Sequence, residues 1–99
     1  MTDTIGWRLE QYTIKHPQEV LIVTAEIAGV EDQIAIYKGF SSSLMNPTSF
    51  DPDVPVLPPQ AKIINIDRVA SPYKPSAPHY LQQGISWETM EQLLSDAGV

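Results

Sequence analysis

Three consecutive serines, Ser41, Ser42 and Ser43, are the first residues of this sequence whose types could do chemistry. Serine hydroxyls beside the backbone amides of a turn can hold a phosphate or another anion. A phosphate-binding loop needs a glycine-rich stretch that ends in lysine and then serine or threonine, whereas here Lys38 and Gly39 precede the serines. The alternative, a strand end whose hydroxyls satisfy nearby backbone groups, is therefore favoured.

The pair Asp67–Arg68 is the second candidate, because it ends a run that is rich in isoleucine. Neighbouring strand residues point to opposite faces, so these two side chains should not bind each other. We expect Arg68 to reach a carboxylate or carbonyl group, and a buried Asp67 to be hydrogen-bonded, which are structural roles. Together with the three serines, the pair also defines a functional hypothesis, a cleft that binds a small molecule or an anion, with or without catalysis.

Patterns for a catalytic triad or a metal site are weak. There is no Gly-x-Ser-x-Gly elbow to present a serine nucleophile, so no catalytic residue is predicted. His16 and His79 are far apart and cysteine is absent, which argues against a zinc site. Asp51 and Asp53 flank a proline and are typical of a turn rather than of a calcium-binding loop. We therefore expect no metal and no cofactor, and a non-enzyme is favoured over an enzyme.

Composition and charge narrow the classes of function further. The 99 residues, 42% hydrophobic and 18% charged, suit a single folded domain over 1–99. The chain is acidic, with a net charge of −6, and its basic residues are scattered, so no nucleic-acid partner is expected. The apolar runs are far shorter than the ~20 residues that span a bilayer, so no membrane insertion is expected. The lack of cysteine fits a reducing, cytoplasmic compartment.

The elements that must position these residues are predicted to be mainly strands. In residues 5–15 every second residue is apolar, at odd positions from Trp7 and at even positions from Tyr12. One extra residue in a strand causes such a switch, so the pattern predicts a strand with a β-bulge. Residues 19–28 are apolar on both faces, as in a central strand. The short connections between strands indicate an antiparallel meander. Two further strands are predicted over 33–40 and 61–71.

The C-terminal part is predicted to hold a proline-rich path followed by a helix. Residues 72–84 suit a polyproline II path along the surface, with a short helical turn ended by Gly84. Ser86 is a plausible N-cap of a helix over 86–97, which must dock on the sheet because it is too short to be stable alone. The predicted class is α+β: a curved antiparallel meander sheet of four to five strands, with a small open barrel as its alternative form, and one C-terminal helix. The helix carries an apolar stripe of Trp87, Met90, Leu93, Leu94 and Ala97.

A proline-rich stretch, residues 40–60, separates two of the strands and is too long for a simple turn. It carries Phe40, Phe50 and Leu57, whose apolar surface is unfavourable in water, so an ordered loop that packs on the sheet is expected. Loops on a rigid sheet are where binding residues concentrate. The leading functional hypothesis is therefore a non-enzymatic module that binds a protein partner through this loop. A homodimer formed through a strand edge is a further hypothesis.

Four stretches, KGFSSSL, TSFDP, VLPPQAKIINIDRVASP and YLQQGISWE, carry a family resemblance. Over roughly residues 18–94 the chain resembles a small protein family of unknown function found in cyanobacteria and plant plastids. The resemblance implies a photosynthetic source and a cytoplasmic setting, which would be stromal in plastid relatives. It implies no catalytic residues.

Overall fold

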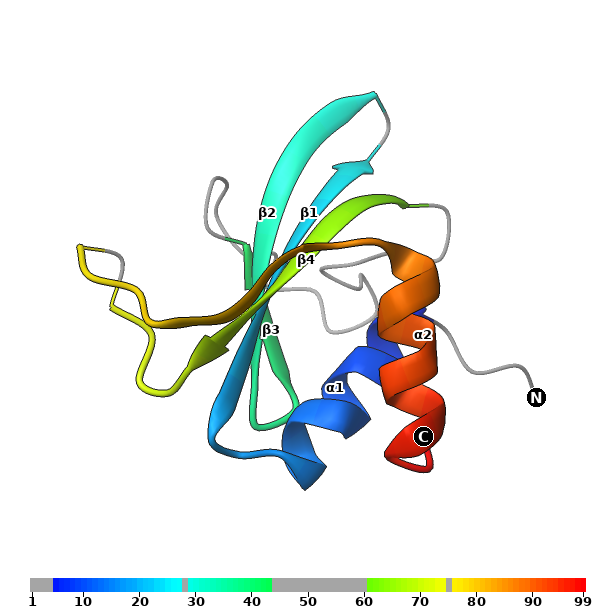
Figure 1. Cartoon of the computed structure of the whole chain (residues 1–99). Coiled ribbons are helices and arrows are strands. Elements are labelled where there is room, and N and C mark those ends of the chain that lie inside the picture. The colour runs from blue at the N-terminus through cyan, green and yellow to red at the C-terminus, as the bar shows by residue number, and fades with distance from the viewer. Residues whose placement is uncertain (1–4, 28, 44–60, 75) are drawn as a thin grey trace.

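Helices pack on one face of an antiparallel sheet in the computed structural model of this chain (Figure 1). The structure describes residues 5–27, 29–43, 61–74 and 76–99, so the loop expected over 40–60 lies, from residue 44 onward, outside the described residues. The elements, in chain order, are α1 (Ile5–Lys15), β1 (Glu19–Ile27), β2 (Val30–Tyr37), β3 (Phe40–Ser43), β4 (Lys62–Ala70), β5 (Tyr80–Ile85) and α2 (Trp87–Asp96).

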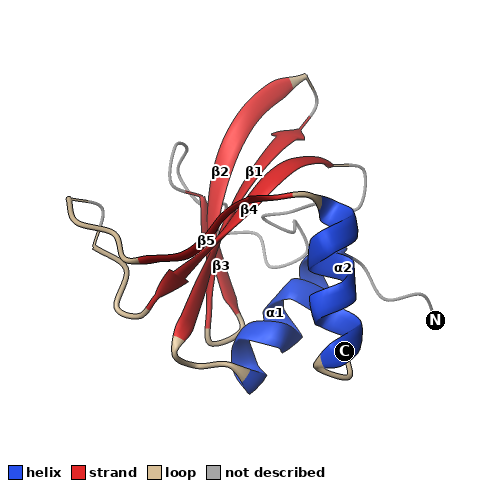
Figure 2. Ribbon diagram, in the orientation of Figure 1, coloured by secondary structure: helices blue, strands red, loops and turns tan. Residues whose placement is uncertain are grey.

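β1 is the central strand of the sheet, as predicted. Among the described residues the sheet has five strands in the order β3-β2-β1-β4-β5, and each neighbouring pair is antiparallel. The part of β1 from Glu19 to Ala25 is buried throughout, because strands flank it on both sides and side chains cover both of its faces. The predicted α+β class is confirmed. The sheet stays open, with β3 and β5 as its edges, and does not close into a barrel (Figure 2).

The first segment forms helix α1, so the bulged strand predicted there is wrong. Leu9, Tyr12 and Thr13 are buried, and their spacings of three and four residues place them on one side of a helix. Trp7, which the strand interpretation places in the core, is 45% exposed, and Ile14 is 53% exposed. Apolar residues spaced three and four apart on a helix fall first on odd and then on even positions of the sequence. In a strand, the same switch between odd and even positions would indicate a β-bulge.

Residues 80–85 form strand β5 rather than the short helical turn predicted there. β5 pairs with β4, where Tyr80 lies opposite Val69. Gly84 has a φ of 63° and does not end a helical turn. Its N–H instead donates to Asp67 Oδ1 over 2.8 Å. The free edge of β4 therefore decides the conformation of this segment, whose own residues have no strong preference for a strand.

A register shift between β1 and β4 changes which isoleucines of β4 are buried. Strict alternation along the strand predicts that Ile64 and Ile66 share one face and that Ile63 lies on the other. The pairing with β1 passes from Asn65 directly to Ile63, so Ile64 is the extra residue of a bulge. Ile64 is 44% exposed, whereas Ile63 and Ile66 both pack on the helix side. The prediction that Ile63 and Ile66 lie on opposite faces is therefore wrong.

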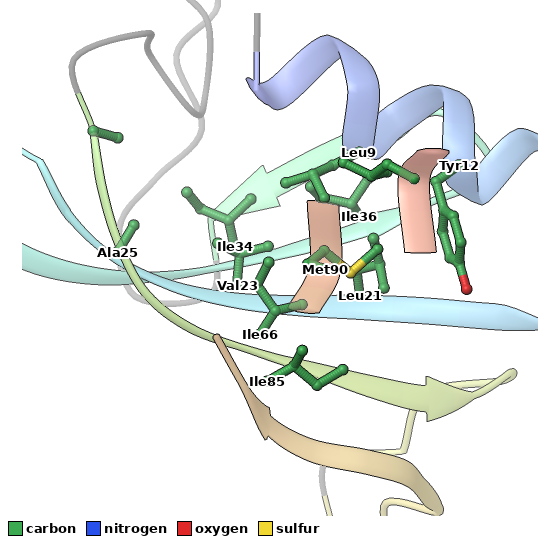
Figure 3. Packing of buried hydrophobic residues seen from close by; sticks show 12 residues of the cluster. Leu9, Tyr12, Leu21, Val23, Ala25, Ile34, Ile36, Ile66, Ile85 and Met90 are labelled. Atoms are coloured by element: carbon green, nitrogen blue, oxygen red, sulfur yellow. The ribbon is translucent and has the colours of Figure 1, made fainter. Parts of the chain in front are cut away.

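Apolar clusters cover both faces of the sheet in the described part of the chain. The cluster on the helix side joins both helices to the sheet, as Figure 3 shows for most of its members. Its buried residues are Leu9, Tyr12, Leu21, Val23, Ala25, Ile34, Ile36, Ala61, Ile66, Ile85, Met90 and Leu94. On the opposite side, which we call the open face, Val20, Ile22 and Val69 are buried, and Ala35, Tyr37 and Tyr73 pack against them.

Helix α2 confirms the predicted C-terminal helix and its N-cap. The Ser86 hydroxyl accepts a hydrogen bond from the Thr89 N–H, which satisfies one of the free donors at the helix start. Met90 and Leu94 are fully buried against the sheet. The other members of the predicted stripe are partly buried in the same cluster: Trp87, Leu93 and Ala97.

Basic side chains of α1 bind the carbonyl groups at the end of α2. Arg8 Nη2 donates to the Val99 carbonyl over 3.0 Å, and Lys15 Nζ donates to the Ala97 carbonyl over 2.9 Å. Ala97 is the C-cap of α2, where the helix dipole is negative, so Lys15 has a favourable partner there. The contacts hold the two helices together on one face of the sheet.

We predict that Leu94→Ala lowers the free energy of unfolding by ~2–4 kcal/mol, because it leaves a cavity beneath α2. Leu93→Ala removes the same atoms from a half-buried position and should cost less than half as much. Urea unfolding followed by tryptophan fluorescence measures both losses. Equal losses at the two positions would show that α2 does not dock through the Leu94 side.

Candidate functional site

A cluster of polar side chains surrounds the buried Glu19 where α1 meets β1 and β4. Glu19 is only 4% exposed. Its Oε1 accepts hydrogen bonds from Tyr12 Oη over 3.0 Å and from Arg68 Nε over 2.7 Å. Its Oε2 lies 3.8 Å from His16 Nδ1, and Arg68 Nη1 donates to Gln82 Oε1 over 3.0 Å. We call these five residues the Glu19 cluster.

Three local features of the fold bring the Glu19 cluster together. The turn after α1 places Glu19 at the first position of β1, and its N–H donates to the His16 carbonyl over 3.0 Å. The β1–β4 register sets Arg68 opposite Leu21. Because alternate strand residues share a face, Glu19 and Arg68 both point to the helix side. The last turn of α1 then brings Tyr12 within hydrogen-bonding distance.

The environment shifts the pKa values of Tyr12, Glu19 and Arg68. Burial, together with the hydrogen bond to Glu19, raises the pKa of Tyr12 to about 12. Burial pushes the pKa of Glu19 upward, but hydrogen bonds from Arg68 and Tyr12 outweigh it and hold that pKa below its ordinary value. The hydrogen bond to Glu19 raises the pKa of Arg68. At neutral pH the cluster therefore contains a carboxylate, a guanidinium and a neutral phenol.

This arrangement is better suited to holding the fold than to proton transfer. A general acid or base works best with a pKa near the operating pH, whereas the pKa values of Glu19 and Tyr12 are shifted away from neutrality. Among the described residues, no buried side-chain nitrogen or oxygen lacks a hydrogen-bond partner. The Glu19 cluster ties α1, β1, β4 and β5 together through its own hydrogen bonds.

The three candidate serines lie on β3 and alternate between the faces of the sheet. Ser41 and Ser43 pair with buried core residues of β2, so both face the helix side. The Ser41 hydroxyl donates to Glu10 Oε2 over 2.7 Å, and the Ser43 hydroxyl donates to Asp32 Oδ2 over 2.9 Å. Ser42 lies between them in sequence and therefore faces the open side.

The predicted binding residues that the structure describes lie on different strands and on both faces of the sheet. β2 and β1 lie between β3 and β4, so about three strand spacings, ~14 Å, separate the serines from Arg68. Asp67 points to the face opposite Arg68. Phe50 and Leu57 lie outside the described residues. The remaining residues divide by face, with Ser41, Ser43 and Arg68 on the helix side and Phe40, Ser42 and Asp67 on the open face.

A row of mostly aromatic and aliphatic side chains crosses the open face. Phe40 pairs with Tyr37, and Val69 pairs with both Val20 and Tyr80. The β1–β2 pairing reaches Leu21 opposite Ile36, and Tyr37 packs against the cluster that contains Val20. One line, which we call the cross-sheet row, therefore runs through Phe40, Tyr37, Val20, Val69 and Tyr80. Its middle is buried, whereas Phe40 is 78% exposed at one edge and Tyr80 is 41% exposed at the other.

Sequence reasoning did not identify Tyr12 or Glu19 as members of a polar site. The wrong strand assignment for residues 5–15 did not place Tyr12 beside Glu19. The helix α1 brings its hydroxyl to the Glu19 carboxylate. Glu19 did carry a signal, since it shares its phase with Leu21 and Val23 in a strand that was expected to be buried on both faces. A glutamate at such a position has to find hydrogen-bonding partners.

The requirements of a metal site and of a membrane-spanning helix can be compared with the described residues. Within the described ranges, no three His, Asp or Glu side chains gather closely enough to hold a metal ion. The helices of those same ranges are too short or too polar to cross a membrane.

Tyr12→Phe should lower the free energy of unfolding by ~1–2 kcal/mol at pH 7, because Glu19 loses a buried hydrogen bond. The folded-state pKa of about 12 lies above the ordinary value of 10.0, so the wild type loses stability as the pH rises from 10.0 through 12. The variant has no phenol at position 12 and does not lose this stability. The difference in the free energy of unfolding between the two proteins should therefore vanish near pH ~11.

Urea unfolding at a series of pH values from 7 to ~11.5 measures this difference. Tyr80→Phe is the matched control, because Tyr80 is an exposed tyrosine outside the Glu19 cluster. A gap between wild type and Tyr12→Phe that stays constant up to the highest pH would contradict the assigned environment of Tyr12.

Comparison with known proteins places the chain in a family. No curated protein and no solved structure matches it at a significant level. The family model described as a domain of unknown function, DUF7734, matches residues 6–94. This match runs from α1 into α2, and it agrees with the resemblance to a family of unknown function over roughly 18–94. The chain therefore belongs to the DUF7734 family of domains of unknown function.

Proposed function

We propose that this domain is a non-enzymatic protein-interaction module and that Phe40 anchors its partner. One observation carries the proposal, which is that the Phe40 side chain is 78% exposed at the edge of the sheet. Exposed apolar surface is unfavourable by ~25 cal/mol per Å², and burial against a partner would recover that free energy. Large aromatic side chains are also common anchors of binding interfaces.

The support beneath Phe40 is rigid, which favours binding because less conformational entropy is lost. Lys38 and Gly39 both have positive φ, 49° and 83°, as in the tight turns that join two hairpin strands. The Gly39 N–H donates to Thr13 Oγ1 of α1 over 2.9 Å. A Cβ atom at Gly39 would lie 2.9 Å from the Ile14 side chain, so the turn approaches the helix closely.

The net charge of −6 favours a partner whose contacting segment is basic as well as apolar. Phe50 and Leu57, which belong to the same proline-rich stretch as Phe40, would extend the contact. The resemblance to cyanobacterial and plastid proteins suggests a partner in the cytoplasm, or in the stroma for plastid relatives. The alternative of an anion-binding cleft would need Arg68 and the serine hydroxyls on one wall, and two strands separate them.

Phe40→Ala should reduce binding of the partner by at least ~10-fold, because it removes the anchor and leaves the fold intact. The tagged domain is first used to capture the partner from a lysate of its organism. Binding of the purified partner to wild type and variants is then measured by calorimetry. Val30→Ala is the matched control, because Val30 is also a well-exposed apolar residue but lies at the far end of β2.

The proposal requires that Phe40→Ala weakens binding and that Val30→Ala does not. A partner that binds Phe40→Ala as tightly as it binds the wild type would exclude Phe40 as the anchor. Turnover of a small molecule by the purified domain would contradict the non-enzymatic part of the proposal.

A further inference from the structure

β5 is an edge strand without charge. Among the described strands it pairs with β4 alone, so its outer side offers free backbone groups. The sequence has no Asp, Glu, Lys or Arg between Lys74 and Glu88, and β5 contains no proline. All of its residues before Ile85 are exposed, including Leu81 at 47%. The outer side of β5 thus combines unpaired backbone with exposed apolar side chains.

Such an edge is unusual, because natural sheets protect their edges with lysine, proline or inward-pointing charges. The register shifts on either side of Arg68 add twist to β5. They leave the start of the strand regular, since the Ala70 N–H donates to the His79 carbonyl over 2.8 Å. Ladder bonds alternate along an antiparallel pair, so the next residue, Tyr80, directs its own N–H and C=O away from β4.

The distribution of charge indicates what would cover this edge. Two copies of a chain with a net charge of −6 repel each other wherever their acidic surfaces meet. β5 itself adds no charged side chain to this edge, so it contributes little to the repulsion between two copies. A basic partner would gain little from a strand that carries no acidic side chain, and would instead be drawn to other surfaces.

We infer that two copies of this chain associate by antiparallel pairing of their β5 strands. The contact would be two-fold symmetric and would join the two sheets into one continuous sheet. Tyr80 and Leu81 of each copy would become buried. The paired edge is only six residues long, so the dimer should be reversible, with a dissociation constant in roughly the micromolar range.

This interface lies at the opposite edge of the sheet from Phe40. A dimer formed through β5 would therefore leave the Phe40 surface free for its partner. The inference does not depend on the proposed function, because it rests on the edge position and exposure of β5 and on the charge of the chain.

Sedimentation velocity between ~10 μM and ~1 mM should show a weight-average mass that rises with concentration for the wild type. Leu81→Lys should shift the dimerisation midpoint at least ~10-fold upward in concentration, because lysine on an edge strand opposes pairing. Gln83→Lys tests the same edge at an exposed position where no apolar group is lost. Val30→Lys is the control, since it adds the same charge to an exposed apolar position far from β5.

All three lysine variants make the chain less acidic, so general repulsion between copies falls in each of them. A loss of dimer in Leu81→Lys and Gln83→Lys, with none in Val30→Lys, would therefore place the contact at β5. Amide exchange gives a second readout, in which the Tyr80 N–H should exchange more slowly as the concentration rises. A wild type that stays monomeric up to ~1 mM, or a dimer unaffected by both β5 variants, would overturn the inference.

Discussion

The ion pair between Glu19 and Arg68 is the interaction on which the arrangement of this fold depends. Glu19 starts the central strand with its carboxylate almost completely removed from water. Burying a charge costs several kcal/mol unless partners compensate for the lost water. The compensation comes from Tyr12 on α1 and Arg68 on β4, and Arg68 in turn holds Gln82 on β5. One carboxylate thereby fixes the relative positions of a helix and three strands.

This ion pair also bears on which side chains remain available to bind a partner. Tyr12, Glu19 and Arg68, whose pKa values are shifted, bind one another on the helix side. Ser41 and Ser43 of β3 donate hydrogen bonds to Glu10 and Asp32. Two exposed aromatic side chains, in contrast, lie at the ends of the cross-sheet row. Phe40 marks one edge of the sheet and Tyr80 the other. Our proposals therefore assign binding to the two edges and stability to the interior.

The sequence predicted the elements whose patterns were long and regular. β1 is apolar on both faces and α2 has a capping serine and a helical stripe, so both were assigned correctly. α1 was misassigned because its exposed Trp7 and Ile14 are strand-forming residues that mask the helical spacing of Leu9 and Tyr12.

Features that depend on contacts distant in sequence could not be predicted in the same way. β5 becomes a strand because β4 offers it an edge, and the bulge at Ile64 depends on the pairing of β4 with β1. Arg68 was expected to reach a carboxylate, but only the register of that pairing identifies Glu19. The long segment after β3 connects one edge of the sheet to a strand beyond β1, a crossover that local pattern does not reveal.

A double-mutant cycle on Glu19→Gln and Arg68→Met tests the central role of the ion pair most directly. Urea unfolding of the two single variants and the double variant gives the coupling free energy between the two side chains. The account predicts that Arg68→Met costs ~3–5 kcal/mol, because it leaves the buried Glu19 carboxylate without its partner. Glu19→Gln should cost less, because the Arg68 side chain is 22% exposed, and the double change should cost well below the sum of the two. Additive losses, with a coupling below ~0.5 kcal/mol, would show that the ion pair does not organise the fold.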